Sequence, residues 1–378
     1  MLESLRAQLS PSTKPQESLG EAFSTRRNAL NALRLGLAGS VILSHAWHIG
    51  GYGTEPQFFG VGLGAWAVLG FFGISGYLIT MSRLTNKSSF RYFRARALRI
   101  VPGLWVSVVF VAFAVSPISA AMRGRSYSLE DAVAFAIHDG LLLAAPPISG
   151  PIGQTLEGLP DDHLWNAPLW TLFWEAFCYL IIGILGAVLR PRLFTSAVVT
   201  LLVLGSAGLW AAGQSENVAF WVLNGPMAPL TAFFAGSTIF CLQKQFSFSL
   251  RNLVIAFLLA GLILASGQGH SLIFLPFITI ILMLSLVLPL KKIGSRYDVS
   301  YGMYIYGWPV QQCLAMSGLQ FVVGPGIFGV VSLLATFPLA WLSCVLIEGP
   351  AQRFGRTRNG KPKATDYRQR EQIQEKAA

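Results

Sequence analysis

The sequence predicts an all-α membrane protein, a polytopic bundle of about ten transmembrane helices with both termini in the cytoplasm. The chain is 53% hydrophobic and 12% charged, which is more apolar material than one soluble core needs. The apolar residues form ten blocks, most of them near the ~20 residues that cross a bilayer as a helix. Lys and Arg are concentrated in alternate connections between these blocks, which indicates that those connections are cytoplasmic.

The expected helices follow the apolar blocks in order. The first block is not followed by a small-residue cleavage site, so it predicts a retained helix rather than a signal peptide. No fixed-period repeat is apparent, so the duplicated halves of many transporters are not indicated. The helices are expected at residues 29–48, 58–81, 100–118, 168–189, 194–212, 226–242, 251–267, 271–290, from about 299 onward, and 327–347.

The polar segments outside these blocks define the domain organisation. Residues 1–27 predict a poorly ordered cytoplasmic leader, residues 28–356 the ten-helix domain, and residues 357–378 a hydrophilic cytoplasmic tail. Residues 119–167 form the longest connection, on the extracytoplasmic side. Within it, residues 128–144 are expected to form an amphipathic helix that lies over the bundle.

The distribution of positive charge predicts the orientation. Of 28 Lys and Arg residues, only Arg123 and Arg125 fall in an extracytoplasmic connection and Arg34 falls inside a helix, which leaves 25 on the cytoplasmic side. This pattern places the protein in the cytoplasmic membrane as a multi-pass protein. It also accounts for the net charge of +11 without nucleic acid, because no basic groove interleaved with aromatic residues is apparent.

The first expected helix carries two ionisable side chains, Arg34 and His45. They are eleven residues apart, so on a helix they lie within about 20° of one face and about 16 Å apart along the axis. An ionisable group costs about 2.5 to 3.5 kcal/mol inside a bilayer and usually faces the bundle interior. The alternatives are that Arg34 extends to the cytoplasmic headgroups and that His45 and His48 are hydrated at the outer interface.

An arginine cluster precedes the third expected helix. Helical spacing brings Arg91, Arg94 and either Arg96 or Arg99 close together. The cluster suits an anchor to the inner leaflet, but guanidinium groups also bind phosphate oxygens in pairs. The sequence therefore allows two roles for the cluster, an anchor to the inner leaflet or a binding site for an anionic cytosolic ligand.

Other sites are not indicated by the sequence. All four cysteines lie in apolar segments and form no CxxC pair, and His45 and His48 alone are weak evidence for a metal, so we expect no metal site and no bound cofactor. GISGY around Ser75 lacks the spacing and the strand of a nucleophile elbow. Gly73, Ser75 and Gly76 are instead expected to permit close helix packing. Glu175, the only acidic residue expected inside a spanning helix, needs a partner.

Taken together, these motifs resemble the acyltransferase 3 family of integral-membrane acyltransferases. The resemblance covers residues 28–356 and consists of Arg34 followed by His45, FFGISGYLIT, SFRYFRARALRIVPGLWV, LWTLFWEAFCYL, VSYGMYIYGWPV and LIEGPAQRF, in that order. It implies a membrane O-acyltransferase that moves an acyl group, most often acetyl, from cytosolic acyl-CoA to a carbohydrate or lipid-linked sugar of the cell envelope or of a secreted molecule.

The resemblance also implies roles for individual residues. His45 matches the family's essential histidine, and Arg34 matches the basic residue before it. Arg96 and Arg99 match the arginine pair. Glu175 matches an acidic position where many relatives have two adjacent glutamates, whereas here Ala176 follows.

On this interpretation acyl-CoA, with acetyl-CoA expected, places its phosphates against Arg96 and Arg99, helped by Arg91, Arg94 and Arg34, and its pantetheine arm enters the bundle. His45 is then the general base toward an acceptor hydroxyl, oriented by Glu175, unless His45 is itself acylated. Trp170 and Trp174 are candidates to stack on the acceptor, although tryptophans also form interface belts.

Two other classes of function are open from the residues alone. Arg34, His45 and Glu175 would also suit a proton-coupled transporter or exporter. A non-catalytic scaffold is the third class, but it would not need three ionisable groups in the bilayer. The arginine cluster and the lack of duplicated halves favour the enzyme.

Overall fold

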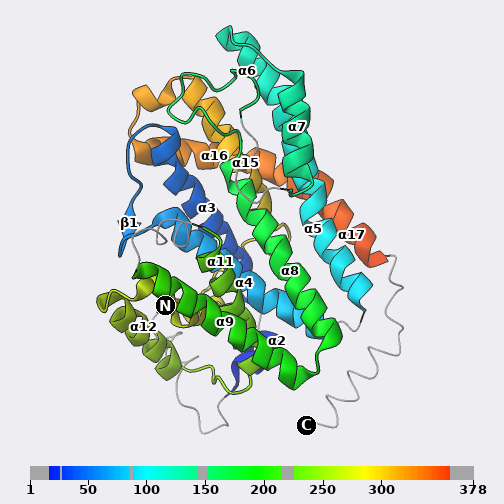
Figure 1. The fold of residues 1–378 in the computed structure, drawn as a ribbon, viewed down its shortest axis with the longest axis vertical. Coiled ribbons are helices and arrows are strands. Elements are labelled where there is room, and N and C mark those ends of the chain that lie inside the picture. Colours follow the sequence, from blue (N-terminus) through cyan, green and yellow to red (C-terminus); the bar gives the residue numbers. More distant parts are fainter. Residues whose placement is uncertain (1–16, 26–27, 86–87, 144–150, 215–224, 358–378) are drawn as a thin grey trace.

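The computed structural model describes residues 17–25, 28–85, 88–143, 151–214 and 225–357. Within these ranges the fold is helical apart from one two-stranded antiparallel hairpin (Figure 1). The elements of the first half are α2 (Leu19–Thr25), α3 (Leu30–Ile49), β1 (Gln57–Phe58), β2 (Val61–Gly62), α4 (Leu63–Thr85), α5 (Ser89–Phe110), η1 (Val111–Val115), α6 (Ser116–Arg123) and α7 (Leu129–Gly140). Those of the second half are η2 (Ala167–Leu169), α8 (Trp170–Val188), α9 (Pro191–Gly213), α11 (Met227–Leu242), α12 (Leu250–Ala265), α13 (Gly269–Leu272), α14 (Phe274–Val287), α15 (Ser300–Met316), η3 (Leu319–Phe321), α16 (Pro325–Ser343), η4 (Cys344–Glu348) and α17 (Gly349–Thr357).

The prediction of a helical membrane protein is confirmed by the length and apolar character of its helices. Among the described residues, five helices are long and apolar enough to cross a membrane, and α11, α12 and α14 are shorter apolar helices. A helix lies at each of the ten expected positions. The count of ten spans and the cytoplasmic placement of both termini stay predictions. The five long helices are Leu63–Thr85, Ser89–Arg123, Ala167–Val188, Pro191–Gly213 and Pro325–Gly355.

The centre of the bundle depends on close contact between α4 and α11. A side chain at Gly76 would overlap the carbonyl of Phe233, and one at Gly236 would overlap the carbonyl of Gly73. Small residues let two membrane helices approach closely, so the predicted packing role of the glycines is confirmed. Ser75, in contrast, does not serve this packing, because its hydroxyl donates to Glu175.

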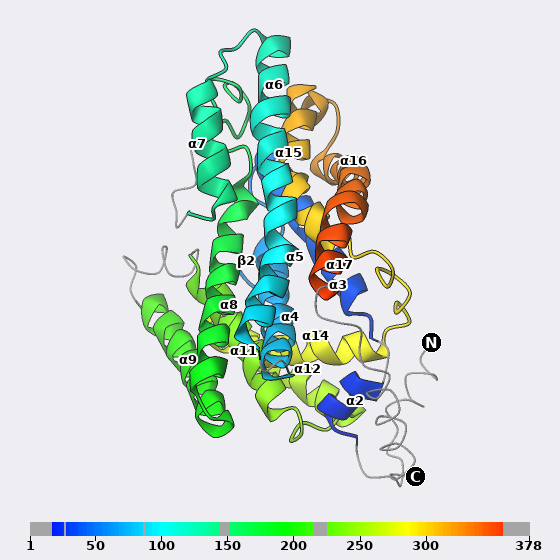
Figure 2. The same cartoon turned by 90° about the vertical axis from the view of Figure 1, so that its right-hand side faces the viewer.

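The helix that carries the arginine cluster begins earlier than expected. The hydroxyl of Ser88 caps its N-terminus by accepting from the backbone N–H of Arg91, so α5 starts at Ser89 rather than near residue 100. The helix continues through η1 and α6 as one rod, seen at the centre of Figure 2. The arginines therefore occupy a regular helix whose faces decide which of them look into the bundle.

The predicted leader differs from the structure at its end. Residues 19–25 form α2, which is preceded by a capping box in which Ser18 and Glu21 exchange hydrogen bonds. Leu19 and Ala22 are buried, and the backbone pairs with residues 246–248. Burial of these apolar side chains therefore holds this part of the leader against the segment around residues 246–248. Residues 1–16 and 26–27 and the tail from 358 lie outside the described residues.

The amphipathic helix predicted in the long connection is confirmed as α7. Ser128 caps it by accepting from the backbone N–H of Asp131. Its buried face, which includes Ala132 and Phe135, packs against α5 and η1. The helix therefore covers the far end of α5 and extends the bundle beyond α3, as Figure 1 shows.

Candidate active site

Four helices, α3, α4, α8 and α15, contribute to three neighbouring cavities. The arginine cavity has a volume of about 540 Å³ and is lined by Arg34, Arg96 and Arg99. The histidine cavity has a volume of about 650 Å³ and is lined by His45 and Trp170. A connecting cavity of about 50 Å³ shares lining residues with both.

Each of these helices contributes at least one side chain to the arginine cavity and at least one other to the histidine cavity. On α8, Glu175 lines the arginine cavity and Thr171, one turn away, lines the histidine cavity, and both line the connecting cavity. On α15, Tyr301 and Tyr304 have the same arrangement. The corresponding pairs are Arg34 with His45 on α3 and Phe71 with Val68 on α4. The three cavities thus form a series through the bundle interior.

The described lining of the arginine cavity has an excess of positive charge. Five arginines face three carboxylates. Such a concave basic surface attracts a multiply charged anion. The arginines are Arg34, Arg96, Arg99, Arg296 and Arg353, and the carboxylates are Glu175, Asp298 and Glu348.

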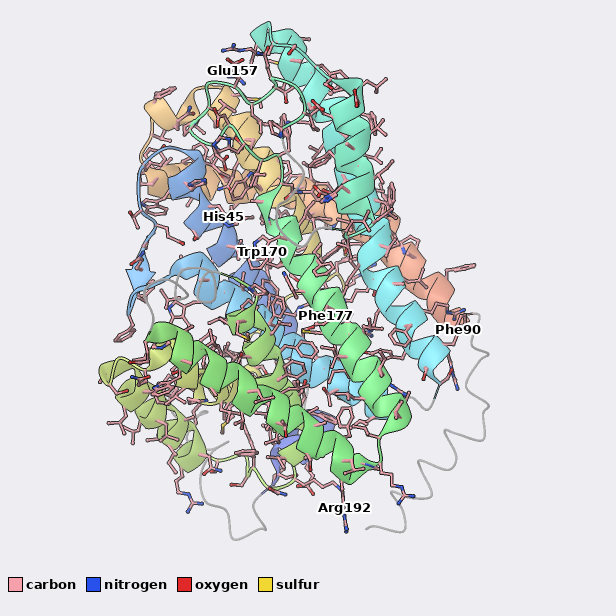
Figure 3. The ribbon with its side chains drawn as sticks, viewed as in Figure 1. His45, Phe90, Glu157, Trp170, Phe177 and Arg192 are labelled. Carbon is pink, nitrogen blue, oxygen red and sulfur yellow. The ribbon has the colours of Figure 1, made fainter. Side chains whose placement is uncertain are left out.

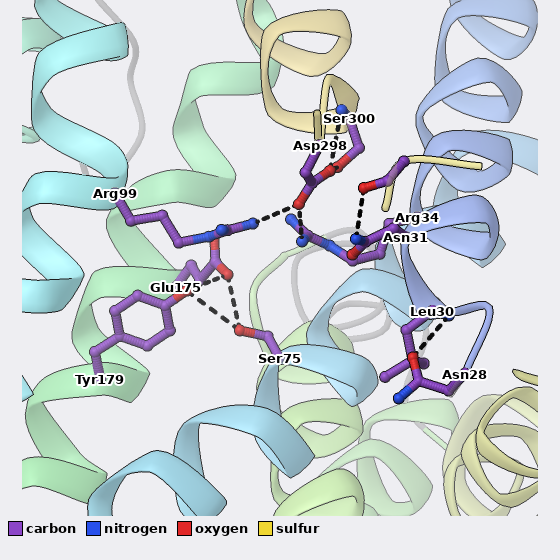
Figure 4. Close-up of polar contacts among 11 residues, drawn as sticks. Asn28, Leu30, Asn31, Arg34, Ser75, Arg99, Glu175, Tyr179, Asp298 and Ser300 are labelled. Atoms are coloured by element: carbon purple, nitrogen blue, oxygen red, sulfur yellow. Dashed lines mark hydrogen bonds and ion pairs between the residues drawn. The ribbon is translucent and has the colours of Figure 1, made fainter. Parts of the chain in front are cut away.

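Asp298 holds two of these arginines together. Arg34 Nη1 donates to Asp298 Oδ2 over 2.5 Å, and Arg99 Nη2 donates to the same oxygen over 3.1 Å (Figure 4). Ser300 Oγ donates to the other carboxylate oxygen over 2.6 Å. Burial opposes ionisation of Asp298, but the charges of Arg34 and Arg99 hold the pKa of the carboxyl well below its ordinary value.

The four arginines of the cluster lie on different faces of α5. Arg96 and Arg99 line the arginine cavity, and the buried Nε of Arg96 has no hydrogen-bond partner among the described residues. Arg91 is exposed and Arg94 donates to the carbonyl of Gly355. At 100° per residue, these two lie about 140° to 160° from Arg96 around the helix. The expected proximity of Arg91 and Arg94 to either Arg96 or Arg99 is therefore not found.

Glu175 belongs to the arginine side of the series. Its carboxylate accepts from Ser75 Oγ over 2.8 Å and from Tyr179 Oη over 2.6 Å (Figure 4). It lines the arginine and connecting cavities but is not among the residues lining the histidine cavity. The structure thus supplies the partners that Glu175 needs, and it does not bring Glu175 together with His45.

His45 lies in the histidine cavity with its ring against Trp308. The two rings meet edge to face, with centroids 4.7 Å apart. Trp308 Nε1 donates to the carbonyl of Leu164, so the indole also holds the end of the long connection. Figure 3 shows His45 and Trp170 in the same part of the molecule. The imidazole therefore has a fixed aromatic neighbour while it faces the cavity.

The two candidate acceptor tryptophans are separated. Trp170 lines the histidine cavity, as a stacking residue would. Trp174 does not line it and instead makes edge-to-face contacts with Phe173 and Phe177. The side chain of Trp174 packs against the core of the bundle. Of these two candidates, therefore, Trp170 is positioned to touch a molecule in this cavity and Trp174 is not.

A second histidine joins the long connection to α3. His48 Nε2 and Asp161 Oδ2 are 3.1 Å apart, and the backbone N–H of His163 donates to the other oxygen of Asp161. Burial opposes ionisation of Asp161, but these hydrogen bonds lower the pKa of its carboxyl. Within the described ranges, no three His, Cys, Asp or Glu side chains form a group that could hold a metal ion.

The comparison with known proteins decides the family. Residues 27–345 match the family model described as acyltransferase domain, of the acyltransferase 3 type. The chain belongs to the acyltransferase 3 family. It is 32% identical over 299 residues to an O-acetyl transferase of Shigella phage Sf6, covering 76% of this chain and 85% of that protein. It is 27% identical to nodulation protein 10 of Rhizobium leguminosarum bv. viciae, covering 88% and 95%. No solved structure matches the chain.

Membership in the acyltransferase 3 family makes this protein a membrane O-acyltransferase. Three carboxylates of its cavities were not singled out from the sequence. Asp298 immediately precedes VSYGMYIY, Glu348 lies in LIEGP, and Glu55 lies in the GGYGTEP turn. Asp298 and Glu348 adjoin or lie within the motifs VSYGMYIYGWPV and LIEGPAQRF, and this is the signal that could have identified them. Glu55 lies in the short connection between the first two expected helices, where no motif points to it. Glu348 is buried in the π-helix η4 and accepts from Ser343 Oγ over 2.9 Å.

Proposed function

We propose that this acyltransferase moves an acetyl group from acetyl-CoA to a hydroxyl of an envelope or secreted glycan or glycolipid. The observation that carries the proposal is the series of cavities, with arginines at one end and His45 at the other. Acetyl is chosen because a relative is named an O-acetyl transferase. A charged donor and a hydroxyl acceptor then enter from opposite ends.

The arginine cavity suits the phosphates of the donor. Arg96 presents a buried Nε without a hydrogen-bond partner among the described residues, and Arg99 and Arg34 are held toward the same cavity by Asp298. Charge-assisted, bidentate bonds to phosphate are what guanidinium groups make best. Arg91 and Arg94 are placed outside this set, because neither lines the cavity.

The connecting cavity suits the extended arm of the donor. A pantetheine arm is narrow and carries two amide N–H groups, and Glu175 offers a carboxylate at the entrance. We therefore assign Glu175 to the donor arm and not to the orientation of His45. The thioester then reaches Thr171 and Tyr304, which line both the connecting and the histidine cavities.

His45 is the proposed catalytic residue. A neutral imidazole nitrogen takes the proton of the acceptor hydroxyl, and the oxygen attacks the thioester carbonyl carbon. The new C–O bond forms, the C–S bond breaks, and the departing thiolate takes the proton from the imidazolium. Trp308 limits the orientations of the ring, and Trp170 provides an aromatic face for the acceptor.

The proposal includes ten spans in the cytoplasmic membrane with the arginine cavity toward the cytoplasm. Figure 3 supports this orientation, because Arg192, in a connection expected to be cytoplasmic, and Glu157, in the long extracytoplasmic connection, lie at opposite ends of the molecule. A reporter fused after residue 378 is expected in the cytoplasm, and one inserted at residue 160 outside. The reverse result would contradict the orientation.

The enzymatic test uses acetyl-CoA labelled in its acetyl group and membranes from producing cells. Wild type and His163→Ala are expected to label a carbohydrate or lipid-linked fraction, and His45→Ala at equal protein level is not. His163 is the matched control, because its side chain is 84% exposed in the long connection. Equal labelling by His45→Ala would contradict the role of His45. Absence of transfer by wild type with several acyl donors would contradict the proposed reaction.

A further inference from the structure

The histidine cavity contains a carboxylate that the proposed reaction does not use. Glu55, on the turn before β1, lines this cavity together with His45. Its Oε2 accepts from the hydroxyl of Ser44, the residue that precedes His45, and from the backbone N–H of Gly64 over 3.3 Å. These bonds tie the carboxylate to the helix that carries the catalytic residue.

One oxygen of this carboxylate is available to a ligand. Both hydrogen bonds formed by Glu55 within the described residues end on Oε2, and Oε1 has none. A side chain at Gly62 would overlap Oε1, so the glycine is what allows the carboxylate to lie at this place in the cavity lining. A carboxylate with one oxygen anchored and the other open is preorganised to accept from a hydroxyl.

The aromatic residues of the cavity suit the flat faces of a sugar ring. Trp170 and Trp66 both line it. Trp66 is held in place because its Nε1 donates to the carbonyl of Phe58 over 3.1 Å and its ring meets Phe277 edge to face. The cavity volume of about 650 Å³ falls within the ~300 to 1,000 Å³ of small-molecule sites.

The charge of this cavity is opposite to that of the arginine cavity. Glu55 is the only carboxylate in its described lining, which contains no Lys or Arg. An anionic sugar placed here would meet a like charge without a compensating cation, and such juxtapositions are strongly unfavourable. Hydroxyl groups would instead donate to Glu55.

We propose that Glu55 binds hydroxyls of the acceptor and that the sugar unit in the histidine cavity is uncharged. This inference rests on the proposed function and names the acceptor's chemical class. Glu55 is a specificity residue, since it selects and positions the acceptor while His45 removes the proton. Acidic sugars, such as uronates, are excluded by charge.

The test measures sugar binding to the purified full-length protein in lipid nanodiscs without acyl-CoA. The probes are matched disaccharides, each neutral sugar with its uronate counterpart, for instance cellobiose and cellobiouronic acid. For at least one pair, wild type is expected to bind the neutral sugar at least about tenfold more tightly, which corresponds to ~1.4 kcal/mol. Glu55→Gln is expected to reduce this preference to about threefold or less. Glu55→Ala should weaken binding of the neutral sugar about tenfold.

Two controls separate charge from structure. Gln57→Ala removes an uncharged polar side chain from the same cavity and should leave the preference unchanged. Glu55→Gln retains an oxygen that can accept from Ser44, so it tests charge while preserving the local fold. Lack of a neutral-sugar preference in all pairs, or the same preference in Glu55→Gln, would overturn the inference.

Failure of this inference can be distinguished from failure of the proposed function. Acyl transfer by wild type combined with a preference that does not depend on Glu55 contradicts this inference alone. A Glu55-dependent preference in a protein that transfers no acyl group contradicts the proposed reaction and supports the sugar site.

Discussion

Arg34 and Arg99, which come from α3 and α5, donate to the same carboxylate oxygen of Asp298. This arrangement neutralises part of the charge of two neighbouring guanidinium groups and points them into one cavity. Arg96 remains beside them with a buried Nε that has no partner in the described part of the chain. The site thus combines two preorganised arginines with a third that has unused hydrogen-bonding capacity.

Replacing Asp298 with Asn is expected to destabilise the protein. Removing one partner of a buried ion pair costs about 3 to 5 kcal/mol, and we expect the lower end of that range or less, because the Asp298 side chain is 22% exposed. Thermal unfolding in detergent should show a lowered Tm. Asp162→Asn, on an aspartate of the long connection whose side chain is 42% exposed, is the control, and equal Tm values for both variants would contradict the prediction.

The arginines on the two faces of α5 are expected to differ in function. Arg96→Ala should raise the KM for acetyl-CoA about tenfold or more, because charged hydrogen bonds contribute about 1.5 to 3 kcal/mol. Arg91→Ala should change it less than about twofold, since Arg91 is exposed outside the cavity. Initial rates at varied acetyl-CoA measure both. A larger effect from Arg91 would place the donor on the other face.

The contact between Asp161 and His48 predicts a pH-dependent contribution to stability. The pKa of Asp161 is lowered in the folded protein, so its carboxylate stabilises the fold fully above its ordinary unfolded pKa of about 3.9. This stabilisation is lost as the pH falls through the lower, folded pKa. Wild type should therefore have a higher Tm than Asp161→Asn at pH 7 and pH 5.

The difference in Tm should decrease below about pH 3.9, where the carboxyl of Asp161 takes up a proton in the unfolded chain before it does so in the folded protein. Thermal unfolding of both proteins between pH 7 and pH 3 measures it. A difference that stays constant over this range would show that the carboxylate charge is not responsible.

Because α4 packs closely on α11, a single methyl group added at their contact should destabilise the protein. Gly76→Ala places a Cβ against the carbonyl of Phe233, and overpacking of this kind costs about 1 to 3 kcal/mol. Gly261→Ala on α12 meets no atom within 4 Å and is the matched control. A lower Tm and a lower yield of folded protein are expected only for Gly76→Ala. Equal behaviour of the two variants would argue against the packing assigned to α4.

The sequence by itself determined the helical membrane architecture and the helix that carries both Arg34 and His45. Apolar length and helical period are local properties of a chain, so blocks of sufficient length could be recognised without knowing their neighbours. The order of the motifs likewise indicated the acyltransferase family, and the family match confirmed it. The N-terminal residues around Leu19 were misjudged because their burial depends on a segment more than 200 residues away.

Only the tertiary structure decided which charged side chains share a cavity. Asp298 meets Arg34 across 264 residues, and Glu55 reaches the cavity of His45 through a turn. No local pattern encodes such contacts, because they depend on how several helices pack and rotate against one another. The same packing turned Arg96 and Arg99, rather than Arg91 and Arg94, into the arginine cavity. It also placed Glu175 with these arginines, whereas the interpretation based on the family resemblance had made Glu175 the residue that orients His45.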